Sequence, residues 1–145
     1  MPQLSTLIYC SRISADLNIT GVYDILEHST HYNTQHNITG MLVFNSRYFL
    51  QAIEGPQTPI LVLRKKIQRD KRHRNFVMLG HEKITKRTWA NWSMSLVTPT
   101  PANRNILEQF NTHDGFDPYR LTFNQAHAML LQLAQHVLIP QVYIA

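Results

Sequence analysis

A glutamine lies in the middle of an otherwise apolar segment, Tyr48–Ile53, whose composition favours a β-strand. Burial of an amide without a hydrogen-bond partner costs about 1–3 kcal/mol, so Gln51 is expected to bind a partner. The amide carries a donor at one end and an acceptor at the other, in nearly the same shape. A half-turn of the Gln51 amide would exchange its hydrogen-bond donor and acceptor with little change in packing. This property suits a side chain that switches between two states.

Tyr9 is the candidate partner of Gln51. It lies in a second apolar segment, Leu4–Ser11, which also favours a strand. A phenol and an amide can satisfy each other's hydrogen bonds. Taken alone, the pair allows two interpretations: a structural hydrogen bond in a core, or part of a functional site.

The predicted elements follow the order βαββαβ and end with one more strand. Helices are predicted from Gly21 to about Tyr32, with Thr20 as a possible cap, and from a cap at Thr58 to about Asp70. The other strands are predicted at Thr39–Phe44, Tyr48–Ile53, Phe76–Leu79 (with Ile84 as an alternative end) and Trp92–Val97. This order indicates an α+β, ferredoxin-like fold with an added fifth strand and two helices on one face of the sheet.

Such a sheet would bring the two polar residues together. Strands one and three are neighbours at its centre, and side chains alternate between the faces of a strand. Tyr9 and Gln51 are therefore expected side by side, facing the two helices. Cys10 is expected on the opposite face, as a small buried residue.

A Thr-Pro-Thr-Pro segment at residues 98–101 marks a boundary between two predicted domains, 1–97 and 98–145. Helices are predicted beyond it at Ala102–Asn111 and Phe123–Leu138. They are expected to cover the other face of the sheet or to mediate self-association. A homo-oligomer, either a dimer or a larger ring, is predicted on this basis.

Composition sets the broad class of the protein. The chain has 145 residues, of which 43% are hydrophobic and 16% charged, so it is expected to fold around a core. It has no apolar run of the roughly 18–20 residues that span a bilayer. The N-terminus does not have the pattern of a secretory signal, and the single Cys10 excludes an internal disulfide. A cytoplasmic location is the simplest expectation.

Half of the basic side chains lie in one short segment. Seven of the fourteen Lys and Arg residues lie in Arg64–Arg74. Two interpretations remain open: a solvated helix end, where cations suit the helix dipole, or a site for a phosphate group. Arg72 and His73 are the best local candidates for the second.

Five short segments, in this order and spacing, are similar to one known family. They are Leu7–Ser11, Asn33 ahead of Ile38–Leu42, Phe49–Gly55, Asp70–His73 and Trp92–Met94. On these residues the chain from about Leu4 to Leu96 resembles the BLUF domain, the flavin-binding blue-light sensor module, in its short stand-alone form. The resemblance implies a flavin between the two helices, with FAD expected and FMN or riboflavin as alternatives.

The resemblance also implies a role for each matching residue. Tyr9 falls at the photo-oxidised tyrosine, Gln51 at the switching glutamine, and Asn33 at the asparagine that holds the polar edge of the flavin ring. Ile25 and Ile67 match positions that pack on the faces of the ring. Arg72 and His73 match positions near the ribityl chain and phosphate, and Trp92 and Met94 match positions that relay the signal into the fifth strand. Tyr32 departs from the family, whose members usually carry Asn or His there.

These roles describe a sensor rather than an enzyme. Tyr9 can give an electron and then a proton to an excited flavin, and their return leaves no net chemistry. Gln51 is left rotated or tautomerised, and its new donor reaches a flavin carbonyl and produces a small red shift. The output is then a population shift that a downstream protein partner reads by contact.

Two other classes of function, and a metal site, are weakly supported by the residues. Arg47–Phe49 faintly resembles the aromatic strand motif of RNA-binding modules, without its glycine or its alternating aromatic residues. Arg12 follows the first strand as in acylphosphatase-like enzymes, but without a glycine-rich phosphate cradle. His28, His31 and His36 cluster near a helix end, but no Cys or second carboxylate completes a metal site, so none is predicted.

Overall fold

The sheet of the protein has five strands. The computed structural model describes residues 2–44, 47–89, 96–97, 101–110 and 117–136. The strands are β1 (Leu4–Ile13), β2 (Thr39–Phe44), β3 (Tyr48–Pro56), β4 (His73–Ile84) and β5 (Leu96–Val97). Their order across the sheet is β4-β1-β3-β2-β5, and every pair is antiparallel except β2 and β5, which are parallel. The ferredoxin-like prediction with an added fifth strand is confirmed.

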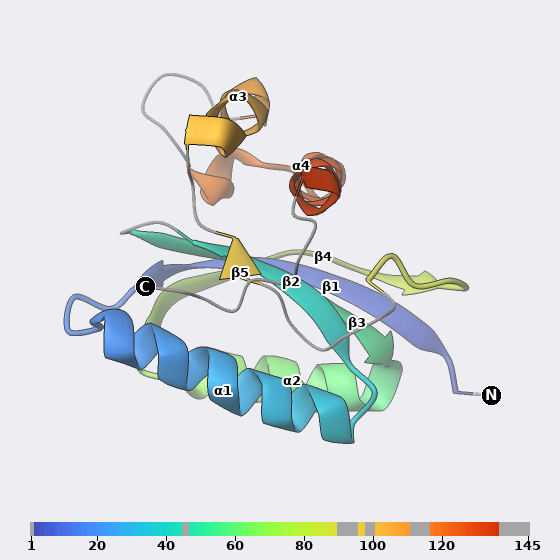
Figure 1. Ribbon diagram of the computed structural model, residues 1–145. Helices are drawn as coiled ribbons and strands as arrows, with labels where there is room; N and C mark the ends of the chain where they lie inside the picture. Colours follow the sequence, from blue (N-terminus) through green and yellow to red (C-terminus); the bar gives the residue numbers. More distant parts are fainter. Residues whose placement is uncertain (1, 45–46, 90–95, 98–100, 111–116, 137–145) are drawn as a thin grey trace.

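Helices cover both faces of this sheet (Figure 1). Helices α1 (Ile19–Gln35) and α2 (Gln57–Arg69) lie side by side on one face. Helices α3 (Pro101–Phe110) and α4 (Phe123–His136), with the short 3-10 helix η1 (Pro118–Arg120), lie on the other. Both expected layers are therefore present. Among the described residues, no helix combines the length and the apolar character needed to cross a membrane.

Side-chain alternation on the central strands divides the core in two. Facing α1 and α2 are buried residues of one parity, among them Leu7, Tyr9, Phe49 and Ile53. Facing α4 are residues of the other parity, including Ile8, Cys10, Leu50 and Ala52. These strands are hydrophobic without interruption because both of their faces are buried.

Both predicted N-caps of α1 and α2 are wrong. Helix α1 begins at Ile19, and Asn18 is its cap, because the Asn18 side chain accepts a hydrogen bond of 2.9 Å from the Gly21 N–H. Helix α2 begins at Gln57 directly after β3, with Pro56 at the cap and no side-chain cap bond. The two threonines, Thr20 and Thr58, lie within the first turns instead.

One row of residues runs across all five strands through the two polar residues. Tyr9 lies opposite Gln51 on one side and Met78 on the other. Gln51 in turn lies opposite Leu42, and Leu42 lies opposite Leu96. The centre of the sheet is thus connected through two residue pairs to the last described strand.

Helix α4 depends on a glycine in β4 for its close approach. A Cβ atom at Gly80 would lie 2.5 Å from the Phe123 ring, nearer than any ordinary contact. We expect Gly80→Ala to lower the free energy of unfolding by about 1–3 kcal/mol because α4 must shift away from the sheet. Urea unfolding of the purified protein measures this loss.

A double-mutant cycle isolates the contact. Phe123→Ala removes the ring that the new methyl group meets, so Gly80→Ala should cost less in that background. Equal costs in both backgrounds would show that the contact with Phe123 is not the cause.

Candidate functional site

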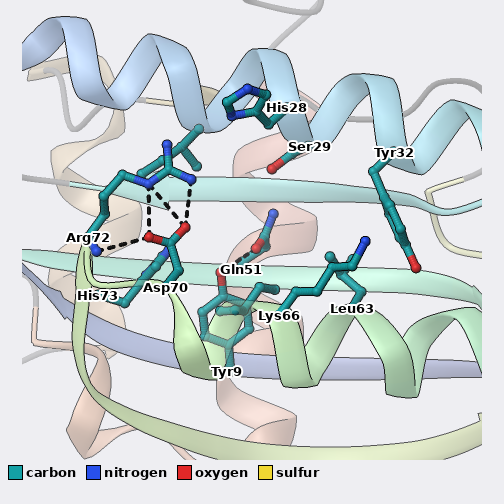
Figure 2. Close-up of a pocket in the computed structure, with 12 residues that line it drawn as sticks. Tyr9, His28, Ser29, Tyr32, Gln51, Leu63, Lys66, Asp70, Arg72 and His73 are labelled. Atoms are coloured by element: carbon teal, nitrogen blue, oxygen red, sulfur yellow. Dashed lines mark hydrogen bonds and ion pairs between the residues drawn. The ribbon is translucent and has the colours of Figure 1, made fainter.

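The predicted contact between Tyr9 and Gln51 is present at the centre of the sheet. The two residues are directly opposite in the β1–β3 register, and the Tyr9 hydroxyl donates to the Gln51 Oε1 atom. Tyr9 is 2% exposed and Gln51 5% exposed, so this bond forms away from water. Figure 2 shows the amide nitrogen of Gln51 on the side away from Tyr9.

A cavity of about 270 Å³ opens above this pair, between the sheet and the two helices. Its lining comes from β1, β3, α1, α2 and the start of β4: Tyr9, Ile25, His28, Ser29, Tyr32, Gln51, Leu63, Lys66, Ile67, Asp70, Arg72 and His73 (Figure 2). Small-molecule sites usually measure about 300–1,000 Å³, and this cavity lies just below that range, which leaves room for a compact ring system.

Tyr9 is held as a neutral phenol. Burial, followed by the charges of Asp70 and Cys10, raises the pKa of the phenol far above its ordinary value. Phe76 stacks on its ring with centroids 4.9 Å apart. The hydroxyl therefore keeps its proton at neutral pH and remains a donor to Gln51.

Arg72 lines the cavity but is already paired with Asp70. Its guanidinium binds the Asp70 carboxylate through Nε and Nη2, the latter at 2.6 Å, and its backbone N–H donates to the same group. Burial alone would raise the pKa of Asp70, but the hydrogen bonds from Arg72 and the charges of Arg72 and His73 outweigh it and lower that pKa. Arg72, the residue predicted to bind a phosphate, is thus oriented by the carboxylate of Asp70.

His73 lies at the first position of β4, beside Tyr9. Its Nδ1 atom is 2.8 Å from the Ser11 hydroxyl, and its ring packs at 4.9 Å from Phe49. Burial lowers the pKa of the imidazole to about 4, although Asp70 opposes this shift, and Arg72 adds to it. At neutral pH His73 is therefore uncharged.

Lys66 and Tyr32 form one side of the cavity, and sequence reasoning did not single out Lys66. The Lys66 ammonium lies 4.2 Å from the centre of the Tyr32 ring, and His36 stacks on the same ring at 4.1 Å. The helical spacing from Leu63 to Lys66 was the available signal, because residues three apart share a face of a helix. At position 32, where the family usually carries Asn or His, the cavity thus has the aromatic ring of Tyr32 with the Lys66 cation over it.

Not every predicted residue lines the cavity. Ile25 and Ile67 do, on facing helices, whereas Asn33 is fully buried one turn beyond Ser29 and is absent from the lining. The Asn33 carbonyl accepts the Ile38 N–H at 2.9 Å and so fixes the chain where it leaves α1. Trp92 and Met94 lie outside the described residues.

The residues present fit a flavin. Apolar side chains on two facing helices suit the faces of a planar ring, and a phenol and an amide at the base suit its polar edge. Lys66 and Arg72 add cationic groups to the lining, and these suit a phosphate-bearing tail. In the described part of the chain, no three His, Cys, Asp or Glu side chains gather as a metal site would require.

Comparison with known proteins identifies the family. The family model of BLUF, described as sensors of blue-light using FAD, matches residues 4–95. The chain therefore belongs to the BLUF family of blue-light sensors, and its cofactor is a flavin, FAD. The RNA-binding alternative is not favoured, and the burial of Phe49 under the helices agrees with this.

Individual relatives support the same assignment. The chain is 29% identical over 121 residues to the blue light- and temperature-regulated antirepressor BluF of Escherichia coli, a match over 83% of this chain and 30% of that protein. It is similar to the BlsA ground state (26% identity, 90% and 87% of the two chains, TM-score 0.81) and to BlrB, a BLUF protein in its dark state (29%, 94% and 98%, TM-score 0.74). The chain spans less than a third of the length of the curated relatives that it matches.

The lowered pKa of His73 predicts a pH dependence of stability. The imidazole has a pKa of 6.5 when unfolded and about 4 when folded, so the unfolded chain binds the extra proton between these values. The free energy of unfolding should therefore fall as the pH decreases from 6.5 to 4, by up to about 3 kcal/mol for this group. Urea unfolding at pH 7 and pH 4.5 measures the loss.

Replacement of the imidazole separates this effect from general acid unfolding. His73→Gln keeps a polar partner for Ser11 but cannot titrate, so it should lose less stability between the two pH values than the parent. His31→Gln, at an exposed position of α1, is the matched control and should keep the parent's slope. An unchanged slope in His73→Gln would assign the pH dependence to other groups.

Proposed function

We propose that Tyr9 and Gln51 carry out the photochemistry of this blue-light sensor, at a flavin bound between α1 and α2. The observation that supports this best is the buried hydrogen bond from the Tyr9 hydroxyl to Gln51 at the base of the cavity. A structural bond in a sealed core would have no cavity beside it. Here the two polar side chains both line one.

The flavin supplies light absorption and an electron-accepting ring when it is bound. Tyr9, a neutral phenol in contact with the cavity, supplies the electron and then releases its proton along the hydrogen bond to Gln51. Both return afterwards, so the chain is not consumed and no substrate is turned over. The proposal is therefore of a sensor and not of an enzyme.

The changed arrangement of the Gln51 side chain is proposed to persist after the electron and the proton have returned to Tyr9. In the described arrangement its Oε1 atom faces Tyr9 and its amide nitrogen faces away (Figure 2). After rotation or tautomerisation of the amide, Tyr9 can accept a hydrogen bond instead, because a phenol oxygen both donates and accepts. Both arrangements thus keep the buried pair satisfied while the group offered to the flavin changes.

The other proposed contacts hold and orient the flavin. Ile25 and Ile67 pack on the two faces of the ring, from α1 and α2 respectively. Asn33 is proposed for the polar edge of the ring, from its buried place one turn past the lining residue Ser29. Arg72 and His73 are proposed for the ribityl chain and phosphate of the flavin.

The output is proposed to pass from the sheet to the C-terminal helices and to a protein partner. In this proposal residues 1–97 form the sensor domain, residues 98–145 form the output or oligomerisation segment, and Trp92 and Met94 relay the signal. Helix α4 packs on the face of the sheet opposite α1 and α2, and this contact supports a signal that leaves the sheet through α4. A homo-oligomer and a cytoplasmic location belong to the same proposal, and the buried lone Cys10 agrees with the latter.

The pair can be tested by absorption spectroscopy. Tyr9→Phe and Gln51→Leu should both purify with bound flavin but should lose the light-induced red shift entirely, because the donor or the reversible amide is absent. Spectra taken before and after blue light measure the shift. Tyr119→Phe, whose hydroxyl bonds the Asn75 carbonyl on the other side of the sheet, is the control and should keep the full shift.

Either of two outcomes would contradict the proposal. One is a normal red shift in both variants. The other is a folded parent protein that takes up flavin and shows no shift under blue light.

The role of Arg72 is tested by comparing flavins. Arg72→Ala should weaken binding of FMN more than binding of riboflavin by roughly tenfold, since a charge-assisted hydrogen bond to phosphate is lost. Titration of flavin-free protein measures both affinities. Arg74→Ala, exposed and outside the cavity lining, is the control.

The Arg72→Ala variant leaves the Asp70 carboxylate without its ion-pair partner, and this side effect needs its own control. Asp70 would repel a phosphate once its partner is gone, so the double variant Arg72→Ala/Asp70→Asn removes that repulsion. Recovery of FMN selectivity in the double variant would mean that Arg72 acts only by neutralising Asp70.

A further inference from the structure

We propose that Glu54 is the positioning residue that couples Gln51 to the C-terminal helices, through a buried carboxylate that binds the backbone ahead of β5. This inference rests on the proposed function, because it names the route by which a rearrangement at Gln51 leaves the site. It concerns a residue outside the cavity lining.

Glu54 follows Gln51 by three residues on β3 and lies on the opposite face of the sheet. It is 1% exposed, and a carboxylate buried to this extent requires hydrogen-bond donors. The donors are two consecutive backbone amides: Glu54 Oε1 accepts from Thr88 N at 2.7 Å and from Trp89 N at 2.9 Å. We call these three residues the Glu54 clamp.

Arg87 fixes the same segment to the rest of the sensor domain. Its guanidinium donates to the Thr39 hydroxyl at 3.0 Å, to the Glu54 carbonyl at 3.1 Å and to the Asn37 carbonyl at 2.6 Å. Arg87, directly before the two clamp residues Thr88 and Trp89, therefore joins β3 to the start of β2 and to the loop that follows α1. If β3 moves, residues 87–89 must move with it or several of these hydrogen bonds break.

The clamp also contacts α4. The Thr88 hydroxyl lies 3.3 Å from Nε2 of His127, and the Trp89 and His127 rings are 6.4 Å apart. Trp89 packs against the buried cluster that contains Met129, Leu130 and Leu133 of α4. A continuous set of contacts thus runs from β3 through the clamp to the helix on the far face.

A second partner for the carboxylate is near. Thr6 lies directly opposite Glu54 in the β1–β3 register, where side chains share a face with Cβ atoms about 4.5–5.5 Å apart. The Thr6 hydroxyl is buried and has no hydrogen-bond partner in the described part of the chain. In the proposed coupling, Glu54 exchanges a backbone donor for this hydroxyl, and these two arrangements are the two states of the coupling element.

The test uses the full chain with its flavin and compares light and dark. In the parent, blue light should change the hydrogen-exchange rates of the amides of α4. Glu54→Gln keeps an acceptor oxygen but loses the charge, so it should keep the red shift while the light-induced change in α4 falls by roughly threefold or more. Thr88→Val keeps the backbone donor and removes the hydroxyl that contacts His127, so it should reduce the change in the same way.

Glu82→Gln is the matched control. Glu82 also lies opposite Thr6, on the other side of β1, but it is exposed, so the same charge change should leave both readouts at parent values. A parent-sized change in α4 in both Glu54→Gln and Thr88→Val would overturn the proposal, as would a parent whose red shift is normal but whose α4 does not respond to light. Loss of the red shift in Glu54→Gln would also overturn it, by assigning Glu54 to the flavin site itself. Failure of the proposed function is distinct, since the parent would then show no red shift.

Discussion

The hydrogen bond between Tyr9 and Gln51 is the constraint on which the rest of the structure depends. Two polar side chains at the centre of a sheet are tolerated only when they satisfy each other, so β1 and β3 must be neighbours in one register. A one-residue slip would turn either side chain toward α4 and leave its partner unpaired. The long apolar strands on both sides supply the packing that holds this register against such a slip.

The same strand serves both faces of the sheet. Gln51 faces the cavity, whereas Leu50 and Ala52 face the core beneath α4, and Glu54 binds the segment that leads to β5. Because interiors are closely packed, a change in the side chain of Gln51 is felt by its neighbours on the strand. The two faces of the sheet are therefore linked through one strand, from which the proposed coupling through Glu54 starts.

The sequence predicted much of this arrangement, and the misses have physical causes. Period-two alternation was sufficient to pair Tyr9 with Gln51, and short motifs were sufficient to indicate the family. The start of α1 was missed because Asn18 and Thr20 are both acceptable caps, and only the backbone decides between them. The Glu54 clamp was invisible because its donors are backbone amides 34 and 35 residues away, and any sequence could supply them.

The electrostatics of the cavity explain why a photochemical step there would reverse itself. Tyr9 is a neutral phenol, His73 is a neutral imidazole, Asp70 and Arg72 form an ion pair, and the Lys66 ammonium lies over the Tyr32 ring. In the proposed photochemical step, loss of an electron from Tyr9 leaves a positive charge in a buried site, where its attraction to the negative charge on the electron acceptor is far stronger than in water. The attraction favours return of the electron over escape. What outlasts the return is a change that carries no net charge, and reorientation of the Gln51 amide is a change of that kind.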